Sequence, residues 1–246
     1  MVISWRIIIL LSLLSLVLVC CSNPYSSLSK HDFEFTSEDN EEAELIALCL
    51  SGELVAPDNL YDLVLMDLEN IRTAFGNKFE PIKSIRFRPP WVAGCLLVGF
   101  DSSTAEMVAN GEYHAWDELN MEYQVTEIDT TSIRNNWGIL YFKDKLNPRH
   151  LLGLYSGLPG IRYAEPNMWF GGSSNVYPGK TMRGISYLFS EGSGDFFPGS
   201  IHRRYWYFVV ELNRIKFIGY WFPDEHPVNP PWWREAERNI DQFRLW

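Results

Sequence analysis

The sequence predicts an α+β protein built around one βαββαβ unit, residues 91–167. The first strand is Val92–Phe100, an apolar run of strand length that a helix-start signal follows directly. The second and third are Val125–Thr131, which is β-branched and alternating, and Trp137–Phe142, which is apolar; a turn between them indicates a hairpin. Ile161–Glu165 predicts the fourth strand.

Two helices connect these strands in the prediction. Ser103 and Glu106 have the three-residue spacing of a capping box, so the first helix is expected to start beside them. It continues to Gln124, with Gly111 as a kink or break. The second helix is expected to have Asn147 as its N-cap, followed by a proline at its first position.

Right-handed crossovers place both helices of such a unit on one face of its sheet, so the order predicts a ferredoxin-like sandwich. The strands Val92–Phe100 and Ile139–Phe142 carry large apolar residues at consecutive positions, which indicates that both faces of the sheet are buried. Two helices predicted upstream, Glu42–Leu50 and Asp58–Phe75, are the candidates to cover the second face.

The C-terminal third predicts an antiparallel meander and a terminal helix. The meander packs against or extends the central sheet, and its strands are Ile185–Phe189, Tyr205–Leu212 and Ile215–Phe222. The Gly- and Ser-rich stretch Gly171–Gly179 before it is expected to be a surface loop. The helix after Asn229 is expected to dock on the core; its polar face mixes Arg with Glu and Asp, which disfavours the alternative of a helix lying on a membrane.

Residues 1–20 predict a secretory leader. Ile7–Val19 is an apolar run that is too short to span a bilayer comfortably as a permanent helix. Its end, Leu18-Val-Cys-Cys21-Ser, resembles the lipobox of bacterial lipoproteins, with Cys20 where that family has Gly, Ala or Ser. The resemblance implies that Cys21 carries the lipid, palmitate included. Because Asp does not follow Cys21, it also implies the outer membrane where the cell has one. An ordinary signal peptide and an N-terminal anchor helix are the alternatives.

Residues 21–40 predict an acidic tether to a single domain, residues 41–246. The carboxylates between Glu34 and Glu44 repel each other and lack the alternate-residue ligand spacing of a calcium loop, so a solvated linker is expected rather than a cation site. The chain has a formal net charge of −10 and no basic stripe with interleaved aromatic residues, which disfavours a nucleic-acid partner.

Two cysteines fall in the predicted domain. Cys49 lies on the first upstream helix, and Cys95 lies on the first strand of the unit, opposite in face to Leu96. If the upstream helices cover that side of the sheet, the two thiols face each other, and an oxidising envelope would allow a disulfide. Two separate buried thiols are the alternative.

No catalytic, dinucleotide, phosphate-binding or metal-ligand motif occurs, so we expect no cofactor and no metal. The nearest cluster of catalytic residue types is Asp195, Ser200 and His202, at a turn of the meander. It supports an envelope hydrolase as an alternative, although closeness in sequence does not establish the geometry of a triad, and a solvated turn is the simpler interpretation. Six aromatic residues either line a groove for an extended polymer or pack internally: Trp169, Phe170, Trp221, Phe222, Trp232 and Trp233.

The series from Leu97 to the strand Leu158-Pro-Gly-Ile-Arg-Tyr-Ala-Glu-Pro-Asn167 resembles the propeptide and inhibitor domain of subtilisin-like proteases over about a third of the chain. The resemblance implies a ferredoxin-like fold and protease binding, with Met168–Ser173 in the protease cleft. The whole chain is also similar to uncharacterised bacterial secreted proteins and lipoproteins, but Phe196 and Ser200 stand where those have cysteines. That second likeness implies no activity.

Together these observations predict a lipid-anchored cell-envelope protein that binds another envelope protein and is not an enzyme. The membrane is reached through the N-terminal lipid. Protease inhibition and envelope hydrolysis remain the alternatives.

Overall fold

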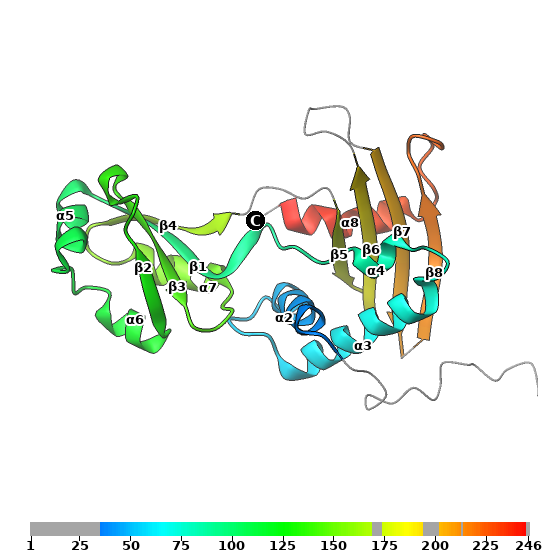
Figure 1. The fold of residues 1–246 in the computed structure, drawn as a ribbon, viewed down its shortest axis with the longest axis horizontal. Coiled ribbons are helices and arrows are strands. Elements are labelled where there is room, and N and C mark those ends of the chain that lie inside the picture. The colour runs from blue at the N-terminus through cyan, green and yellow to red at the C-terminus, as the bar shows by residue number, and fades with distance from the viewer. Residues whose placement is uncertain (1–34, 169–173, 194–201, 213, 245–246) are drawn as a thin grey trace, which may run out of the picture. The chain divides into compact units, whose positions relative to one another are not determined.

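The computed structural model describes residues 35–168, 174–193, 202–212 and 214–244. These residues form a mixed α+β fold with two four-stranded antiparallel sheets and seven α-helices (Figure 1). The α+β class predicted from the sequence is therefore confirmed. The second sheet is a difference from the prediction, in which the C-terminal strands pack against or extend the central sheet.

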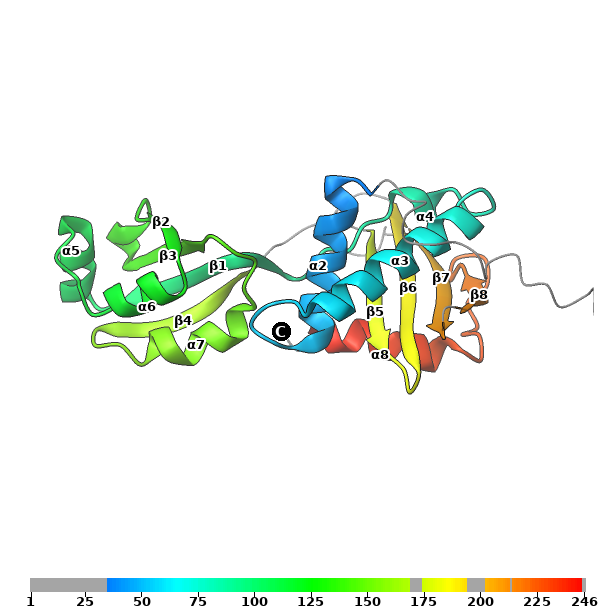
Figure 2. The ribbon, with the colours of Figure 1, turned by 90° about the horizontal axis from the view of Figure 1, so that it is seen from below.

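The first sheet contains the four predicted central strands. Its strand order is β2-β3-β1-β4, and every neighbouring pair is antiparallel. The helices α5, α6 and α7 lie beside it (Figures 1 and 2). The elements, in chain order, are β1 (Trp91–Phe100), α5 (Ser102–Asn110), α6 (Asp117–Glu122), β2 (Val125–Asp129), β3 (Trp137–Phe142), α7 (Pro148–Ser156) and β4 (Ile161–Met168).

Local signals set these helix boundaries. Asp101, not Ser103, is the N-cap of α5: its carboxylate accepts from the Thr104 N–H at 2.7 Å, so the predicted capping box is wrong by two residues. Gly111 ends α5 with φ 74°, a left-handed conformation that glycine adopts without steric cost, which confirms the predicted break. Asn147 caps α7 as predicted.

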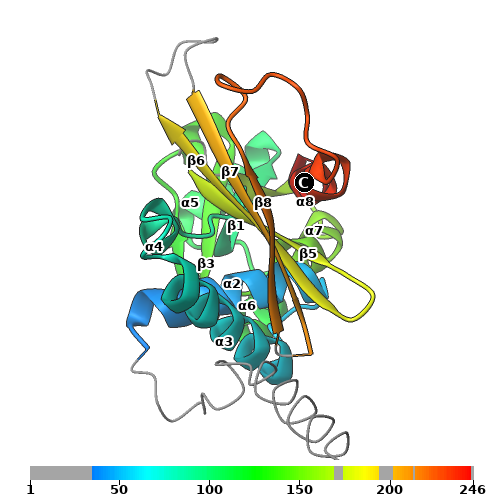
Figure 3. The same ribbon diagram turned by 90° about the vertical axis from the view of Figure 1, so that its right-hand side faces the viewer.

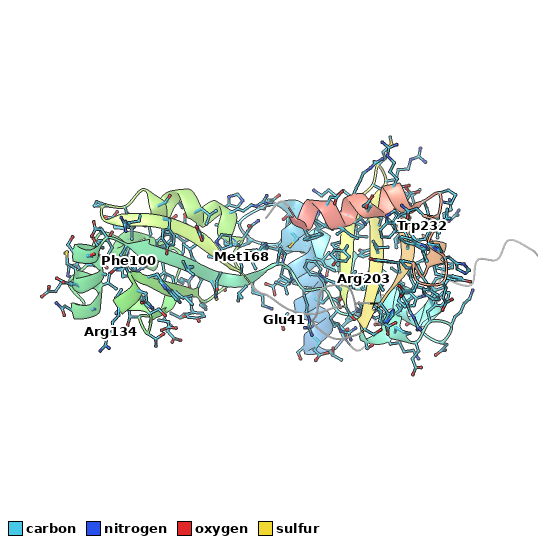
Figure 4. All side chains as sticks on the ribbon, turned by 90° about the horizontal axis from the view of Figure 1, so that it is seen from above. Glu41, Phe100, Arg134, Met168, Arg203 and Trp232 are labelled. Carbon is cyan, nitrogen blue, oxygen red and sulfur yellow. The ribbon has the colours of Figure 1, made fainter. Side chains whose placement is uncertain are left out.

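One face of the first sheet is buried against its helices. Alternate residues of β1 (Leu96, Val98 and Phe100) pack with Leu140 and Phe142 of β3 and with apolar residues of α5 and α7. The ladder between β1 and β4 runs from Phe100, opposite Ile161, to Trp91, opposite Met168, and both ends can be found in Figure 4.

The second sheet is a meander of four strands rather than three. Its order is β5-β6-β7-β8, with β5 (Asn175–Lys180), β6 (Gly184–Ser193), β7 (His202–Glu211) and β8 (Arg214–Trp221). The strand β5 lies in the stretch expected to be a loop. Pro178 is tolerated because β5 is an edge strand, and Gly179 is required because a Cβ there would lie 2.1 Å from the Asn239 side-chain oxygen.

Both faces of the second sheet are covered. The helices α2 (Ser37–Ser51), α3 (Asp58–Phe75) and α4 (Pro81–Ser84) pack on one face, and α8 (Trp233–Arg244) packs on the other (Figure 3). The upstream helices therefore cover the second sheet, so the prediction that they cover the first sheet is wrong. The terminal helix docks on the core as predicted, through Trp233 and Ala236.

The helix α2 begins at Ser37, five residues earlier than expected, because Thr36 and Asp39 form a capping box. The acidic run is therefore not wholly a solvated tether. Glu42, only 2% exposed, accepts from the Arg72 guanidinium at 2.7 and 2.9 Å and from the Phe87 N–H at 2.8 Å. Burial raises the pKa of Glu42, and the charge of Arg72 opposes that shift.

Candidate functional site

The face of the first sheet opposite its helices is the candidate site. It carries Leu97 and Gly99 of β1, Trp137, Ile139 and Tyr141 of β3, and Tyr163 of β4, a set called the open face below. Its five larger residues belong to none of the three apolar clusters that the described residues form. Among the described residues, no helix packs on them.

Strand register defines rows of neighbours on the open face. Ile139 lies opposite Leu97, and this pair forms the apolar centre of the face. In the same row, Asp129 of β2 lies opposite Ile139, and Glu165 of β4 lies opposite Leu97. The row therefore has a carboxylate on each edge strand and two aliphatic side chains between them.

Aromatic residues lie on both sides of this row. Tyr163 lies opposite Gly99, and its ring occupies the place of the missing side chain, because a Cβ on Gly99 would lie 2.2 Å from ring carbons of Tyr163. The ring is 37% exposed. Tyr141 lies opposite both Cys95 and Glu127. Flat rings on a sheet give large contact area at a low cost in side-chain entropy.

Three carboxylates, called the acidic rim below, border the open face: Glu127, Asp129 and Glu165. Hydrogen bonds from the Thr131 backbone and hydroxyl lower the pKa of Asp129, so it is ionised at neutral pH. Burial raises the pKa of Tyr141, and the neighbouring Cys95, Asp129 and Glu127 add to that shift.

Two cations next to these strands interact with groups outside the open face. Lys143 donates to the Gln124 side-chain oxygen at 3.3 Å. Arg162, at the irregularity between β1 and β4, acts on the carboxylate of Asp101 at the start of α5. The open face is therefore apolar at its centre and negative at its edges.

A cavity of about 450 Å³ beside α2 is a competing site. Its wall combines Trp91, Phe87 and Leu45 with charged residues of both signs. Two of its three cations form ion pairs: Arg86 lies 3.5 Å from Asp39, and Lys145 lies 3.1 Å from Glu41. A ligand there would have to displace these ion pairs, so the open face is the stronger candidate.

The predicted hydrolase cluster is only partly within the described residues. Asp195 and Ser200 lie outside them. His202, the first residue of β7, is exposed, and its Nδ1 lies 2.8 Å from a carboxylate oxygen of Asp224. The partner of His202 is therefore Asp224, which the sequence analysis did not consider. No group of three or more metal-ligating side chains occurs in the described parts of the chain.

Both thiols are free in the structure, which corresponds to the alternative of two separate thiols rather than to the possible disulfide between Cys49 and Cys95. Cys49 is on α2, which packs on the second sheet, whereas Cys95 is on β1 of the first. Burial raises the pKa of both thiols, that of Cys95 to about 11, so neither is a reactive thiolate at neutral pH.

The aromatic groove predicted from the sequence is core packing where it is described. Trp221 and Trp233 are buried with their rings 4.4 Å apart, and Trp232 stacks on Tyr207 at 5.6 Å. Phe222 packs at the edge of the other cluster. Trp169 and Phe170 lie outside the described residues.

The predicted leader and the lipidation site, Cys21, also lie outside the described residues. So do residues 169–173, which are most of the segment that the propeptide resemblance places in a protease cleft. In the part of the chain that is described, no helix has the length and apolar character needed to cross a membrane.

The sequence interpretation missed the open face because it assumed that consecutive apolar residues on β1 and β3 mean two buried faces. A signal was present in the alternation of β2: Glu127 and Asp129 share one side of that strand, where a buried face would carry apolar residues. Comparisons of the chain with family models, with curated proteins and with solved structures find no match.

Proposed function

We propose that this chain is a lipid-anchored protein of the bacterial cell envelope whose folded part binds another macromolecule and performs no catalysis. The anchoring part of the proposal is supported by the leader and by the lipobox-like sequence ending at Cys21. In a cell that has an outer membrane, we propose that the lipid anchors the chain to that membrane.

The binding part is carried by one observation: the open face holds apolar and aromatic side chains that are at most partly buried and belong to none of the described apolar clusters. Soluble proteins seldom leave a contiguous apolar patch exposed unless it contacts a partner. The described pair of His202 and Asp224 is solvent-exposed, which gives a hydrolase no comparable support.

The assignment of the first sheet and its helices to the ferredoxin-like fold is also part of this proposal. The element order β1-α5-α6-β2-β3-α7-β4 with strand order β2-β3-β1-β4 is what a ferredoxin-like split βαβ sandwich requires. That assignment supports the likeness to protease propeptides, but a shared fold does not carry function. Inhibition of a protease stays a narrower version of the binding proposal, and slowed turnover by subtilisin-like proteases without cleavage of the chain would support it.

Lipidation is tested by metabolic labelling with a palmitate analogue. We expect the wild-type chain and the matched control Cys20→Ser to be labelled and to fractionate with membranes, and Cys21→Ser to lose both properties. Labelling of Cys21→Ser at the wild-type level would contradict the anchoring proposal.

Binding is tested by pull-down from solubilised envelopes with the full lipidated chain. The test variant is Ile139→Ser with Tyr163→Ser, and the control is Met121→Ser, which changes an apolar residue of α6 that is 79% exposed. We expect the wild type and the control to capture the same partner and the open-face variant to lose it. Thermal unfolding of each variant shows whether the fold is intact. Equal capture by all three would contradict a role for the open face.

A further inference from the structure

We propose that the open face takes an extended basic segment of a protein partner, which crosses the strands with an apolar side chain on Ile139 and Leu97 and a cationic side chain at each end of the row. The inference rests on the proposed binding function and names the chemistry of the partner. It is carried by the placement of Asp129 and Glu165 on the two edge strands, with the aliphatic pair between them.

The distance between the two carboxylates of the row sets the distance between the two cations of the partner segment. Asp129 and Glu165 are separated by three inter-strand gaps, which amounts to about 14 Å at the usual separation of strands. An extended segment rises about 3.3 Å per residue, so residues four apart are about 13 Å apart and point to the same side. A segment with cations at positions i and i+4 and an apolar residue at i+2 therefore fits the row.

Charge favours this occupant over two others. A second copy of the chain would bring two acidic rims together, and each copy carries a net charge of −10. An anionic lipid surface would meet the same carboxylates. A basic segment alone pairs with Asp129 and Glu165 while it covers the apolar centre.

The test uses the full chain purified in detergent and three labelled peptides at low salt. The matching peptide is Ser-Lys-Ser-Leu-Ser-Lys-Ser. One control has the same composition with adjacent cations, Ser-Lys-Lys-Leu-Ser-Ser-Ser, and the other has Glu in place of both Lys. Binding is followed by fluorescence anisotropy for the wild type and for Asp129→Asn with Glu165→Gln.

We expect the matching peptide to bind best, and the carboxylate variant to weaken it about tenfold at low salt, the effect of losing two exposed ion pairs. Added salt should reduce the difference between the two proteins. Equal binding of the three peptides, or no effect of the carboxylate variant, overturns the inference.

Three further outcomes separate this inference from the proposed function. If envelope capture is lost with Ile139→Ser and Tyr163→Ser but unchanged with the carboxylate variant, the binding function stands and the basic segment is excluded. If sedimentation shows self-association that the open-face variant abolishes, a second copy is the occupant and the inference is overturned. If neither variant affects capture, the proposed function itself fails.

Discussion

The two sheets of this protein each have four antiparallel strands, but the strands are connected in a different order and the faces are covered differently. The strand β6 of the second sheet is buried from Ile185 to Ser190 without interruption, because α3 packs on one of its faces and α8 on the other. The strand β1 of the first sheet is as apolar, yet helices cover only the face of Leu96. Leu97, one residue later, lies on the open face.

The difference teaches that apolar residues at consecutive positions do not by themselves mean two covered faces. In the second sheet, the strand paired with β6 is also apolar on both sides, from Tyr205 to Val210. In the first sheet, the row of Ile139 and Leu97 ends in a carboxylate on each edge strand. The rows across a sheet, rather than one strand, distinguish a core from a surface.

The largest expected effect is a loss of stability, and it is tested by truncating one residue in each sheet. Phe208 of β7 is fully buried between α3 and the sheet, so Phe208→Ala is expected to lower the free energy of unfolding by about 4 kcal/mol. Ile139→Ala, on the open face, should cost about 1 kcal/mol or less. Urea unfolding followed by tryptophan fluorescence measures both. Equal losses would show that the open face is a core.

A smaller effect is expected from the ion pair that fastens α2 to α3. Arg72→Met removes the guanidinium that lies 2.7 Å from the buried carboxylate of Glu42 and leaves only Arg86, 3.8 Å away, as a cationic neighbour, so it should lower the free energy of unfolding by about 3 kcal/mol. Replacing both residues by Met removes the unpaired charge and should recover most of the loss in the same urea assay. A double variant no more stable than Arg72→Met would be inconsistent with this explanation.

A pH-dependent effect is expected at Asp67 of α3, which is 3% exposed and accepts from the Tyr187 hydroxyl at 3.0 Å. Burial raises the pKa of Asp67 to about 7, although the hydrogen bond opposes the shift. The folded chain then holds a proton that the unfolded chain loses near pH 4. The stabilising contribution is therefore complete below about pH 4 and is lost as the pH rises to about 7.

Relative to Asp67→Asn, the wild type should lose up to about 1.4 kcal/mol of stability per pH unit between pH 4 and 7. Urea unfolding at a series of pH values measures the difference. Glu106→Gln, at an exposed position on α5, is the control and should follow the wild type. An Asp67→Asn profile parallel to the wild type would exclude a protonated buried carboxyl.

Treatment with a reductant is expected to have no effect on the alkylation of Cys49 and Cys95. Cys49 and Cys95 are free, so both should react with an alkylating reagent after denaturation without reductant, and intact mass spectrometry should show two additions within residues 35–246. Reaction in the folded state should be slow, because burial raises the pKa of both thiols. Alkylation that requires prior reduction would establish the disulfide after all.

Most elements were predictable from local sequence. The bounds of α3 and β3 match the predictions, and the Gly111 break and the Asn147 cap follow from single-residue chemistry. The strand β5 was not predictable because its Gly179 and Pro178 are typical of loops. Only the close approach of Asn239 on α8 and the edge position of the strand explain those residues.

By itself, the amino-acid sequence determined the order of strands and helices, the predicted leader and the negative charge, because each depends on spacing along the chain. The tertiary structure decided which sheet the upstream helices cover, because the apolar residues of α2 and α3 could pack on any apolar sheet face and only packing selects one. That choice buries Glu42 and Asp67 and separates Cys49 from Cys95. It also leaves Leu97 and Ile139 only partly buried and Tyr163 exposed, which is why the candidate site could be found only in the folded chain.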